Sequence, residues 1–383
     1  MLIGVLSTVF PTRRNPTAGI FVKEELEALS GFVDVRLLAP LPNQHWISAL
    51  GSTPVHTLYP VFRPFTLAFP RFFLQHCYPA SLAFTLRLRG SRFFRGCDVI
   101  HAHNAFPEGV AAVRAFGHDR PVVVTVHGSD INHFAMKPSL KPDIVTALNA
   151  SAHIICVSGS LAVTLRSIGV TTETTVIPNG INTTMLHPGD KAEATHLLGL
   201  DPSRKRILFA GNFVPVKGVE YLIKAMPTVL AEYPGCELVL LGASSVTAGR
   251  QVYAGAISEE GIGKTVRIVE RVPHDHLPSW IHASDLLALP SLNEGFGLVA
   301  AEALACGRPV VATLSGGPED IVEEGTGVLV PPRDPEALAR GMVRVLNGEG
   351  IDGPEELAMS ARRRFSYERV AERITEVYTA VLS

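Results

Sequence analysis

The stretch LLALPSLNEGFGLVAAE, residues 286–302, places a short apolar strand, a glycine-containing turn and the start of a helix in direct succession. Glu294 and Glu302 lie eight residues apart, one in the turn and one a turn into the helix predicted from Leu298. Glycines between them allow close approach of a ligand to the backbone. The first N–H groups of such a helix favour a phosphate.

The two carboxylates suit different contacts. Glu302 could accept hydrogen bonds from a ribose diol, and Glu294 could hold a polyhydroxylated group. The alternative interpretation is an ordinary acid near a helix start together with a solvated glutamate.

The same alternation of strand and helix extends outward in both directions. Near-continuous Val/Ile/Leu strands are typical of parallel sheets buried on both faces. The first series is predicted at 2–6, 33–38, 99–101, 122–126, 154–157 and 175–177, and the second at 206–210, 237–241, 266–268, 286–288, 309–312 and 327–330. Two such series predict two doubly wound α/β domains that meet near residues 180–190, with a cleft between them as the expected site.

Composition limits the class of protein. The chain has 383 residues, 46% of them apolar and 18% charged, which is enough for two cores and too apolar for disorder. No 18-residue window is apolar without a charge or proline, so we expect no spanning helix. The first basic residues follow the N-terminal apolar run, and the five cysteines form no CxxC. Both features favour a cytoplasmic protein.

Charge is uneven along the chain. Residues 35–97 hold seven arginines, no Asp or Glu, and many aromatic side chains. For residues 59–95 three interpretations stay open: helices that dock on an anionic membrane surface, a polyanion site, or buried aromatics with solvated arginines. The near-neutral net charge of −2 argues against nucleic acid as a partner.

Lys217 stands at a helix start, where the helix dipole disfavours a cation. It lies in FAGNFVPVKGVEYL, residues 209–222, after a strand that ends in glycine. An anionic ligand such as a diphosphate would explain this placement. The alternative is an exposed lysine without a ligand.

Polar residues also end two strands of the first series. His103 and Asn104 follow one strand, and His127, Gly128 and Asp130 follow another, so they are predicted to line a substrate site. Metal binding by histidines is the weaker alternative, because no carboxylate spacing supports it. The loop that contains Gly19 could contact a phosphate or serve only as a linker.

Taken together, these motifs resemble the retaining glycosyltransferases of family 4, which have the GT-B fold: two Rossmann-like domains that face each other across a cleft. The matching segments are residues 18–29, 98–103, 125–130, 176–182, 209–225, 279–313, 316–339 and 365–374. The forms AGIFV and FVPVKG are similar to members that build polysaccharides. The resemblance implies an acceptor domain at 1–185, a nucleotide-sugar domain at 186–360, and a C-terminal helix, 361–383, that packs back toward the first domain.

The resemblance also implies roles for individual residues. Glu294, His127 and Lys217 would be catalytic. The donor, a UDP- or GDP-sugar, would contact Gly19, Asn212, Lys217, Arg271, Val272, Glu294, Gly295, Phe296, Gly297, Leu298 and Glu302. A glycan or lipid-linked acceptor would meet His103, Asn104, Gly128 and Asp130. Neither a metal nor another cofactor is implied.

One position departs from the family. Many members have arginine where this chain has Asn212 beside the diphosphate, so Lys217 would be the main cation there. Two rival hypotheses remain: a sugar-nucleotide epimerase or phosphorylase of GT-B type, and a catalytically silent scaffold with this fold.

Overall fold

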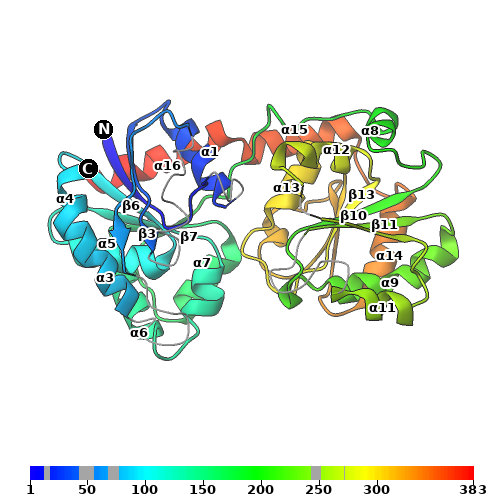
Figure 1. Ribbon diagram of the computed structural model, residues 1–383, viewed down its shortest axis with the longest axis horizontal. Helices are drawn as coiled ribbons and strands as arrows, with labels where there is room; N and C mark the ends of the chain where they lie inside the picture. Colours follow the sequence, from blue (N-terminus) through cyan, green and yellow to red (C-terminus); the bar gives the residue numbers. More distant parts are fainter. Residues whose placement is uncertain (13–17, 43–55, 68–76, 243–251, 271) are drawn as a thin grey trace. The chain divides into compact units, whose positions relative to one another are not determined.

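The computed structural model describes residues 1–12, 18–42, 56–67, 77–242, 252–270 and 272–383. The chain divides into two compact units, drawn in Figure 1. Unit 1 comprises Met1–Gly180 and Tyr367–Ser383, and unit 2 comprises Ile181–Ser366. The predicted boundaries were residues 185/186 and 360/361. The α/β class with two doubly wound parallel sheets is confirmed.

Unit 1 is built on a seven-stranded parallel sheet in the order β4-β2-β1-β6-β7-β8-β9. Its strands are β1 (Leu2–Leu6), β2 (Asp34–Leu38), β4 (Val61–Phe62), β6 (Val99–His103), β7 (Val122–Val126), β8 (His153–Cys156) and β9 (Thr174–Val176). A separate two-stranded sheet pairs β3 (Leu41–Pro42) with β5 (Phe65–Thr66). The side chains of β7 are buried along its whole length, as its unbroken apolar sequence predicts.

Helices cover both faces of this sheet. They are α1 (Ile20–Leu29), α3 (Cys77–Thr85), α4 (Ser91–Phe93), α5 (Val110–Phe116), α6 (Lys141–Asn149), α7 (Gly159–Ser167) and α16 (Tyr367–Leu382), with the π turns η1 (Leu86–Gly90), η2 (Ala105–Gly109) and η3 (Asp130–Phe134). The apolar faces of α1 and α16 share one core with β1, β2 and β6. The last helix of the chain therefore completes the first unit.

Unit 2 is built on a six-stranded parallel sheet in the order β12-β11-β10-β13-β14-β15. Its strands are β10 (Arg206–Ala210), β11 (Glu237–Leu241), β12 (Val266–Val269), β13 (Leu286–Leu289), β14 (Val310–Thr313) and β15 (Gly327–Val330). In both sheets the strand order reverses beside the first strand of the unit, which is where ligands bind in open α/β sheets.

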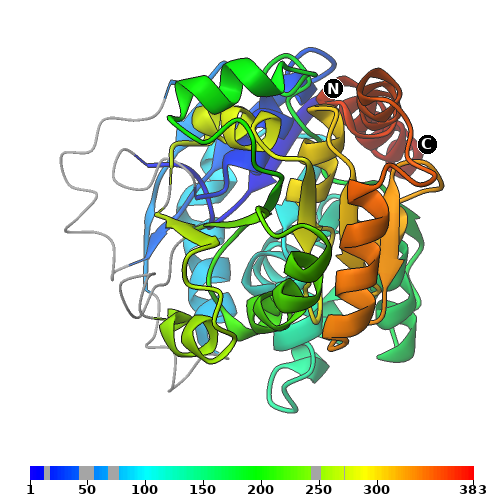
Figure 2. The ribbon, with the colours of Figure 1, turned by 90° about the vertical axis from the view of Figure 1, so that its right-hand side faces the viewer.

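The helices of unit 2 are α8 (Lys191–Leu197), α9 (Val219–Glu232), α11 (Ala254–Glu259), α12 (Leu277–His282), α13 (Leu298–Ala305), α14 (Pro335–Leu346) and α15 (Pro354–Phe365), with the 3₁₀ turns η4 (Pro215–Lys217), η5 (His274–His276) and η6 (Pro318–Asp320). The helices α9 and α14 pack together on one face of the sheet, and α13 and α15 lie on the other (Figure 1). Figure 2 shows α14, in orange, running alongside the strands. Asp334 caps α14 by accepting from the amide of Ala337 at 2.9 Å.

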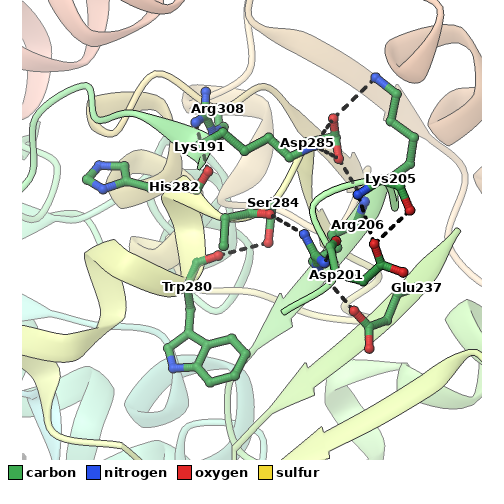
Figure 3. Close-up of polar contacts among 12 residues, drawn as sticks. Lys191, Asp201, Lys205, Arg206, Glu237, Trp280, His282, Ser284, Asp285 and Arg308 are labelled. Atoms are coloured by element: carbon green, nitrogen blue, oxygen red, sulfur yellow. Dashed lines mark hydrogen bonds and ion pairs between the residues drawn. The ribbon is translucent and has the colours of Figure 1, made fainter. Parts of the chain in front are cut away.

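A cluster of charged side chains holds the amino-terminal ends of β10, β11 and β13 together (Figure 3). Arg206 is fully buried, and its Nε donates to Oε2 of Glu237 at 3.0 Å. Asp285 accepts from Lys191 at 2.7 Å and from Lys205 at 3.3 Å. Ligands of parallel α/β sheets bind at the opposite, carboxyl-terminal ends. We therefore infer that this cluster stabilises the fold and does not bind a ligand.

Candidate active site

The loop that follows β10 meets the loop that follows β13 at a close backbone contact. Gly218 has a φ of 64°, and a Cβ atom there would lie 2.1 Å from the carbonyl oxygen of Pro290. The amide of Leu292 donates to the carbonyl of Val216 at 2.7 Å. Only glycine fits at position 218, because any side chain would push these two loops apart.

This contact places Lys217 against Glu294. Lys217 Nζ donates to Oε2 of Glu294 at 2.5 Å, and Ser291 Oγ donates to the same oxygen at 2.9 Å. The side chains of Lys217 and Glu294 are 26% and 12% exposed, so solvent reaches the pair from one side. Both residues were predicted for the donor site, whereas their pairing and the contribution of Ser291 were not.

Glu294 is also fixed through its backbone. Its amide donates to the carbonyl of Ser315 at 2.8 Å, and its carbonyl accepts from the amide of Gly317 at 2.9 Å. Phe296 is buried, with its ring edge-on to Phe365 at 5.7 Å between centroids. The Phe296 side chain therefore serves packing, and its backbone is the part that a ligand could contact.

The predicted helix start is observed at the predicted residue. Gly297, with a φ of 97°, precedes α13, whose first residue is Leu298. Gly295, in the turn just before, is half-buried. The backbone thus takes the tight turn that the glycines between the two glutamates predict.

Glu302 lies in the second turn of α13 and is 4% exposed. Its Oε1 accepts a hydrogen bond from Nε2 of His274, in η5, at 2.9 Å. His274 was not predicted, because nothing in its local sequence marks it. Val272 is half-buried two residues before it, and Arg271 lies outside the described residues.

Two other predicted donor residues lie at loop ends. Asn212 is exposed after β10, and its carbonyl accepts from the amide of Val214 at 3.0 Å. Gly19 belongs to unit 1 and starts α1 with a φ of 66°. A Cβ atom on Gly19 would lie 2.4 Å from the carbonyl oxygen of Val9, so this glycine serves a close contact between two loops.

In unit 1 the structure brings the two predicted histidines together. His103 Nδ1 lies 3.1 Å from His127 Nε2, and their rings are stacked. His103 is fully buried and stacks on His101 as well, whereas His127 is partly exposed. Burial lowers the pKa of all three imidazoles, that of His101 to about 3, so the stack is uncharged at neutral pH.

Asp130 organises the backbone around this stack. Its Oδ1 accepts from the amides of Gly128 at 2.8 Å and His127 at 3.2 Å, and its Oδ2 accepts from the amide of Ala105 at 2.8 Å. Asn104 precedes Ala105 and has a φ of 77°, an unusual conformation for a residue other than glycine. The carboxylate of Asp130 therefore ties together the two loops on which the acceptor residues were predicted.

Two buried acids near these loops were missed by the sequence analysis. Glu25 Oε1 lies 3.6 Å from His103 Nε2, and burial raises the pKa of Glu25 to about 8. Glu108 accepts from the amide of Thr8 at 2.9 Å, and burial raises its pKa to about 7. Both acids lie on helical segments whose local pattern gives no sign that they are buried.

Residues 59–95 are described except for 68–76. The run from α3 through η1 to α4 exposes Phe84 and Leu88, 68% and 64% accessible, together with Arg87, Arg89 and Arg92. Phe94 is fully buried instead. This segment therefore has one exposed face with both apolar and basic side chains.

The part of the chain that the structure describes has three further properties. None of the helices among these described residues is both long enough and apolar enough to cross a membrane. The described residues contain no group of three or more His, Cys, Asp or Glu placed to hold a metal ion. A groove of about 1520 Å³ follows the edge strand β12 and is lined in part by Trp280 and Arg267, away from the donor residues described above.

Both units match known sequence families. Residues 18–185 match the family described as Glycosyltransferase Family 4, and residues 204–348 match Glycosyl transferases group 1. The D-inositol 3-phosphate glycosyltransferase of Thermobispora bispora is 31% identical over 308 residues, which cover 74% of this chain and 71% of that protein. The protein of the same name from Xylanimonas cellulosilytica is 32% identical, with coverages of 78% and 76%.

One relative is more similar over a shorter part. The D-inositol 3-phosphate glycosyltransferase of Segniliparus rotundus is 37% identical over 215 residues, or 54% of this chain. The matched region spans about half of that relative, 47% of its length.

Solved structures agree on the fold. Sucrose-phosphate synthase from Thermosynechococcus elongatus matches with a TM-score of 0.81 at 22% identity, over 100% of this chain and 99% of its own. Anabaena HepE, solved in complex with UDP, matches with a TM-score of 0.76 at 20% identity, over 99% of both chains. The chain belongs to the glycosyltransferases that combine family 4 and group 1 domains, and it has their GT-B fold.

Proposed function

We propose that the protein transfers a sugar from a UDP- or GDP-sugar to a glycan or lipid-linked acceptor, with retention of anomeric configuration. The observation that carries this proposal is the contact of Lys217 with Glu294 beside the start of α13, one helical turn before Glu302. A cation, a helix start and two acids together suit a diphosphate flanked by two polyhydroxylated groups, a ribose and a sugar. The UDP in HepE supports UDP as the nucleotide to test first.

The chain's own groups would act on the leaving diphosphate. As the bond from the anomeric carbon to the phosphate oxygen breaks, negative charge grows on the diphosphate, and Lys217 and the start of α13 stabilise it. The acceptor oxygen bonds to the anomeric carbon on the face that the phosphate leaves, and its proton passes to the departing phosphate oxygen. Because these groups carry the charge, we propose that neither a metal nor another cofactor takes part.

We assign acceptor binding to unit 1. The acceptor would contact the loops that carry Asn104 and Gly128, which the buried side chains of His103 and Asp130 hold in place. His127 would line the reaction centre as an uncharged ring, since burial lowers its pKa. The names of the relatives favour a phosphorylated polyol, D-inositol 3-phosphate, as a soluble acceptor to test beside lipid-linked glycans.

A thermal-shift panel with UDP, GDP, ADP and CMP, with and without magnesium, tests the donor assignment. A ligand at about 100 times its Kd adds about 2.7 kcal/mol to the folded state, which raises Tm by several degrees. A shift with one nucleoside diphosphate that is independent of magnesium supports the proposal. A shift that requires magnesium contradicts the metal-free mechanism. The absence of any shift favours the silent-scaffold hypothesis.

We further propose that unit 1 docks on the inner face of the cytoplasmic membrane through residues 77–95. Phe84 and Leu88 are one helical turn apart, and arginines flank them, which complements anionic lipid. Sedimentation with phosphatidylglycerol vesicles should show binding at low salt that falls as ionic strength rises. F84S/L88S should bind less, whereas V163S, in which an equally exposed residue of α7 is changed, should bind as the wild type does. Equal binding by both variants would refute this surface.

A further inference from the structure

His274 and Glu302 form a pair that the donor assignment alone does not explain. Nε2 of His274 lies 2.9 Å from Oε1 of Glu302, and the two side chains are 23% and 6% exposed. A carboxylate can only accept, so the imidazole N–H points at the acid. The residues come from separate elements, η5 after β12 and α13 after β13, so the contact also ties two loops together.

Glu302 needs such a contact because of its surroundings. Its side chain is 6% exposed, so little water reaches the carboxylate. A buried carboxylate is costly unless donors satisfy it, and the imidazole N–H of His274 supplies one donor. One imidazole N–H uses one of its roughly four acceptor positions, and a ribose diol needs two.

We infer that His274 is a positioning residue of the nucleotide site, which orients the Glu302 carboxylate toward the ribose diol and so sets the preference for ribonucleotides over 2′-deoxyribonucleotides. This inference rests on the proposed function, in which Glu302 accepts from the ribose. It predicts a specific loss when His274 is removed: discrimination at the 2′ position falls, while contacts to the diphosphate persist.

The experiment compares two ligands across matched variants. Calorimetry gives the Kd of UDP and of dUDP, or of GDP and dGDP if the guanine nucleotide binds more tightly, for the wild type, H274A, H274Q, H276A and E302Q. His276 provides the control, because it is an exposed histidine in the same 3₁₀ turn. Gln at 274 keeps an N–H donor at a similar reach, so H274Q tests the hydrogen bond and not the ring.

The expected readout is the ratio of the two dissociation constants. A hydrogen bond to a charged acceptor corresponds to about tenfold in affinity, so the wild type and H276A should prefer the ribonucleotide about tenfold. In H274A and E302Q this preference should fall to about threefold or less, and in H274Q it should return to within twofold of the wild type. Inorganic pyrophosphate, which lacks ribose, should bind the wild type and H274A equally.

Other outcomes show whether this inference fails alone or the proposed function fails with it. If H274A weakens both nucleotides by the same factor, so that the ratio is unchanged, His274 is merely structural and the inference is overturned, while the donor site stands. If E302Q keeps the wild-type ratio, the assignment of Glu302 to the ribose fails, and the inference fails with it. If the wild type binds no nucleotide, the proposed function is refuted as well.

Discussion

Lys217 contacts Glu294, so replacing either residue should change nucleotide affinity. The two replacements should act in opposite directions. In the ligand-free protein the ammonium group of Lys217 already donates to Glu294. A diphosphate has to draw Lys217 away from this acid, and it also meets the acid's negative charge. E294Q should therefore tighten the binding of a nucleoside diphosphate, whereas K217M should weaken it.

The geometry sets the magnitude. A hydrogen bond between charged groups contributes about 1.5–3 kcal/mol when shielded, and exposed pairs contribute about 0–1 kcal/mol. The distance from Lys217 Nζ to Glu294 Oε2 is 2.5 Å, and the two side chains are 26% and 12% exposed. The pair is therefore partly shielded, and its contribution should lie between these two ranges. We take about 1.4 kcal/mol, or tenfold in Kd. E294Q should lower the Kd of UDP about tenfold, and K217M should raise it at least tenfold.

The assay is calorimetric titration of the single variants and of K217M/E294Q. In the double variant the gain from E294Q should vanish, because no lysine is left to be released. K224M, which removes an exposed lysine from α9, is the charge-matched control and should bind as the wild type does. Turnover of the nucleotide sugar should fall at least tenfold, about 1.4 kcal/mol of barrier, in both single variants. Weaker UDP binding by E294Q, or a gain that persists without Lys217, would refute the reasoning.

Three further predictions concern stability. G218A should destabilise the protein by about 2 kcal/mol or more in urea unfolding and weaken nucleotide binding, because residue 218 has a positive φ and its Cβ would meet Pro290. G235A is the control: a Cβ at this position meets no atom within 4 Å, so the change should be nearly neutral. The pKa of Glu25 is raised from 4.5 to about 8, so the folded chain keeps a proton that the unfolded chain loses, and stability falls as pH rises through this window. E25Q should therefore be more stable than the wild type by about 3 kcal/mol at pH 7 and no more stable at pH 4.5, and a difference that does not vary with pH would contradict this. R206M should cost about 3–5 kcal/mol in urea, since it leaves Glu237 buried beside one partner fewer, and R206M/E237L should recover part of the loss.

Local sequence predicted those elements whose apolar run is bounded by polar or glycine residues. The strands 2–6, 122–126, 206–210, 237–241 and 327–330 have the bounds that the sequence indicated, and α13 begins at the predicted Leu298. The C-terminal helix predicted at residues 361–383 is instead divided between two helices, α15 and α16. Ser366 is extended between them, with a ψ of 144°, and the amide of Ile181 donates to the carbonyl of Phe365 at 2.8 Å. A contact with a segment nearly two hundred residues away sets this break, so helix propensity alone misses it.

In the candidate site, too, local sequence marks some residues, whereas the roles of others depend on contacts with distant segments. Local sequence marks Lys217 and Glu294, because each has a glycine beside it between a strand end and a helix start, and the structure brings the two side chains together. Glu302 was marked by its spacing from Glu294, and the donor roles of all three stay predictions. His274, Ser291 and Glu25 were not marked in this way, since their importance depends on partners that other strands bring to them. Asp130 was predicted as an acceptor contact, and that role stays a prediction. Its observed partners are backbone amides, which local sequence does not reveal.

The discontinuity of unit 1 has a consequence for biosynthesis. Its core includes Val370, Ile374 and Tyr378 of α16, and the Tyr378 hydroxyl lies 2.6 Å from Nδ1 of the buried His101. A ribosome makes these residues after all of unit 2. The core of unit 1 therefore stays incomplete until unit 2 has been synthesised, whereas every segment of unit 2 precedes α16 in the chain. The segment Met1–Gly180 is thus made before unit 2, but it can reach its complete core only after unit 2 has been made.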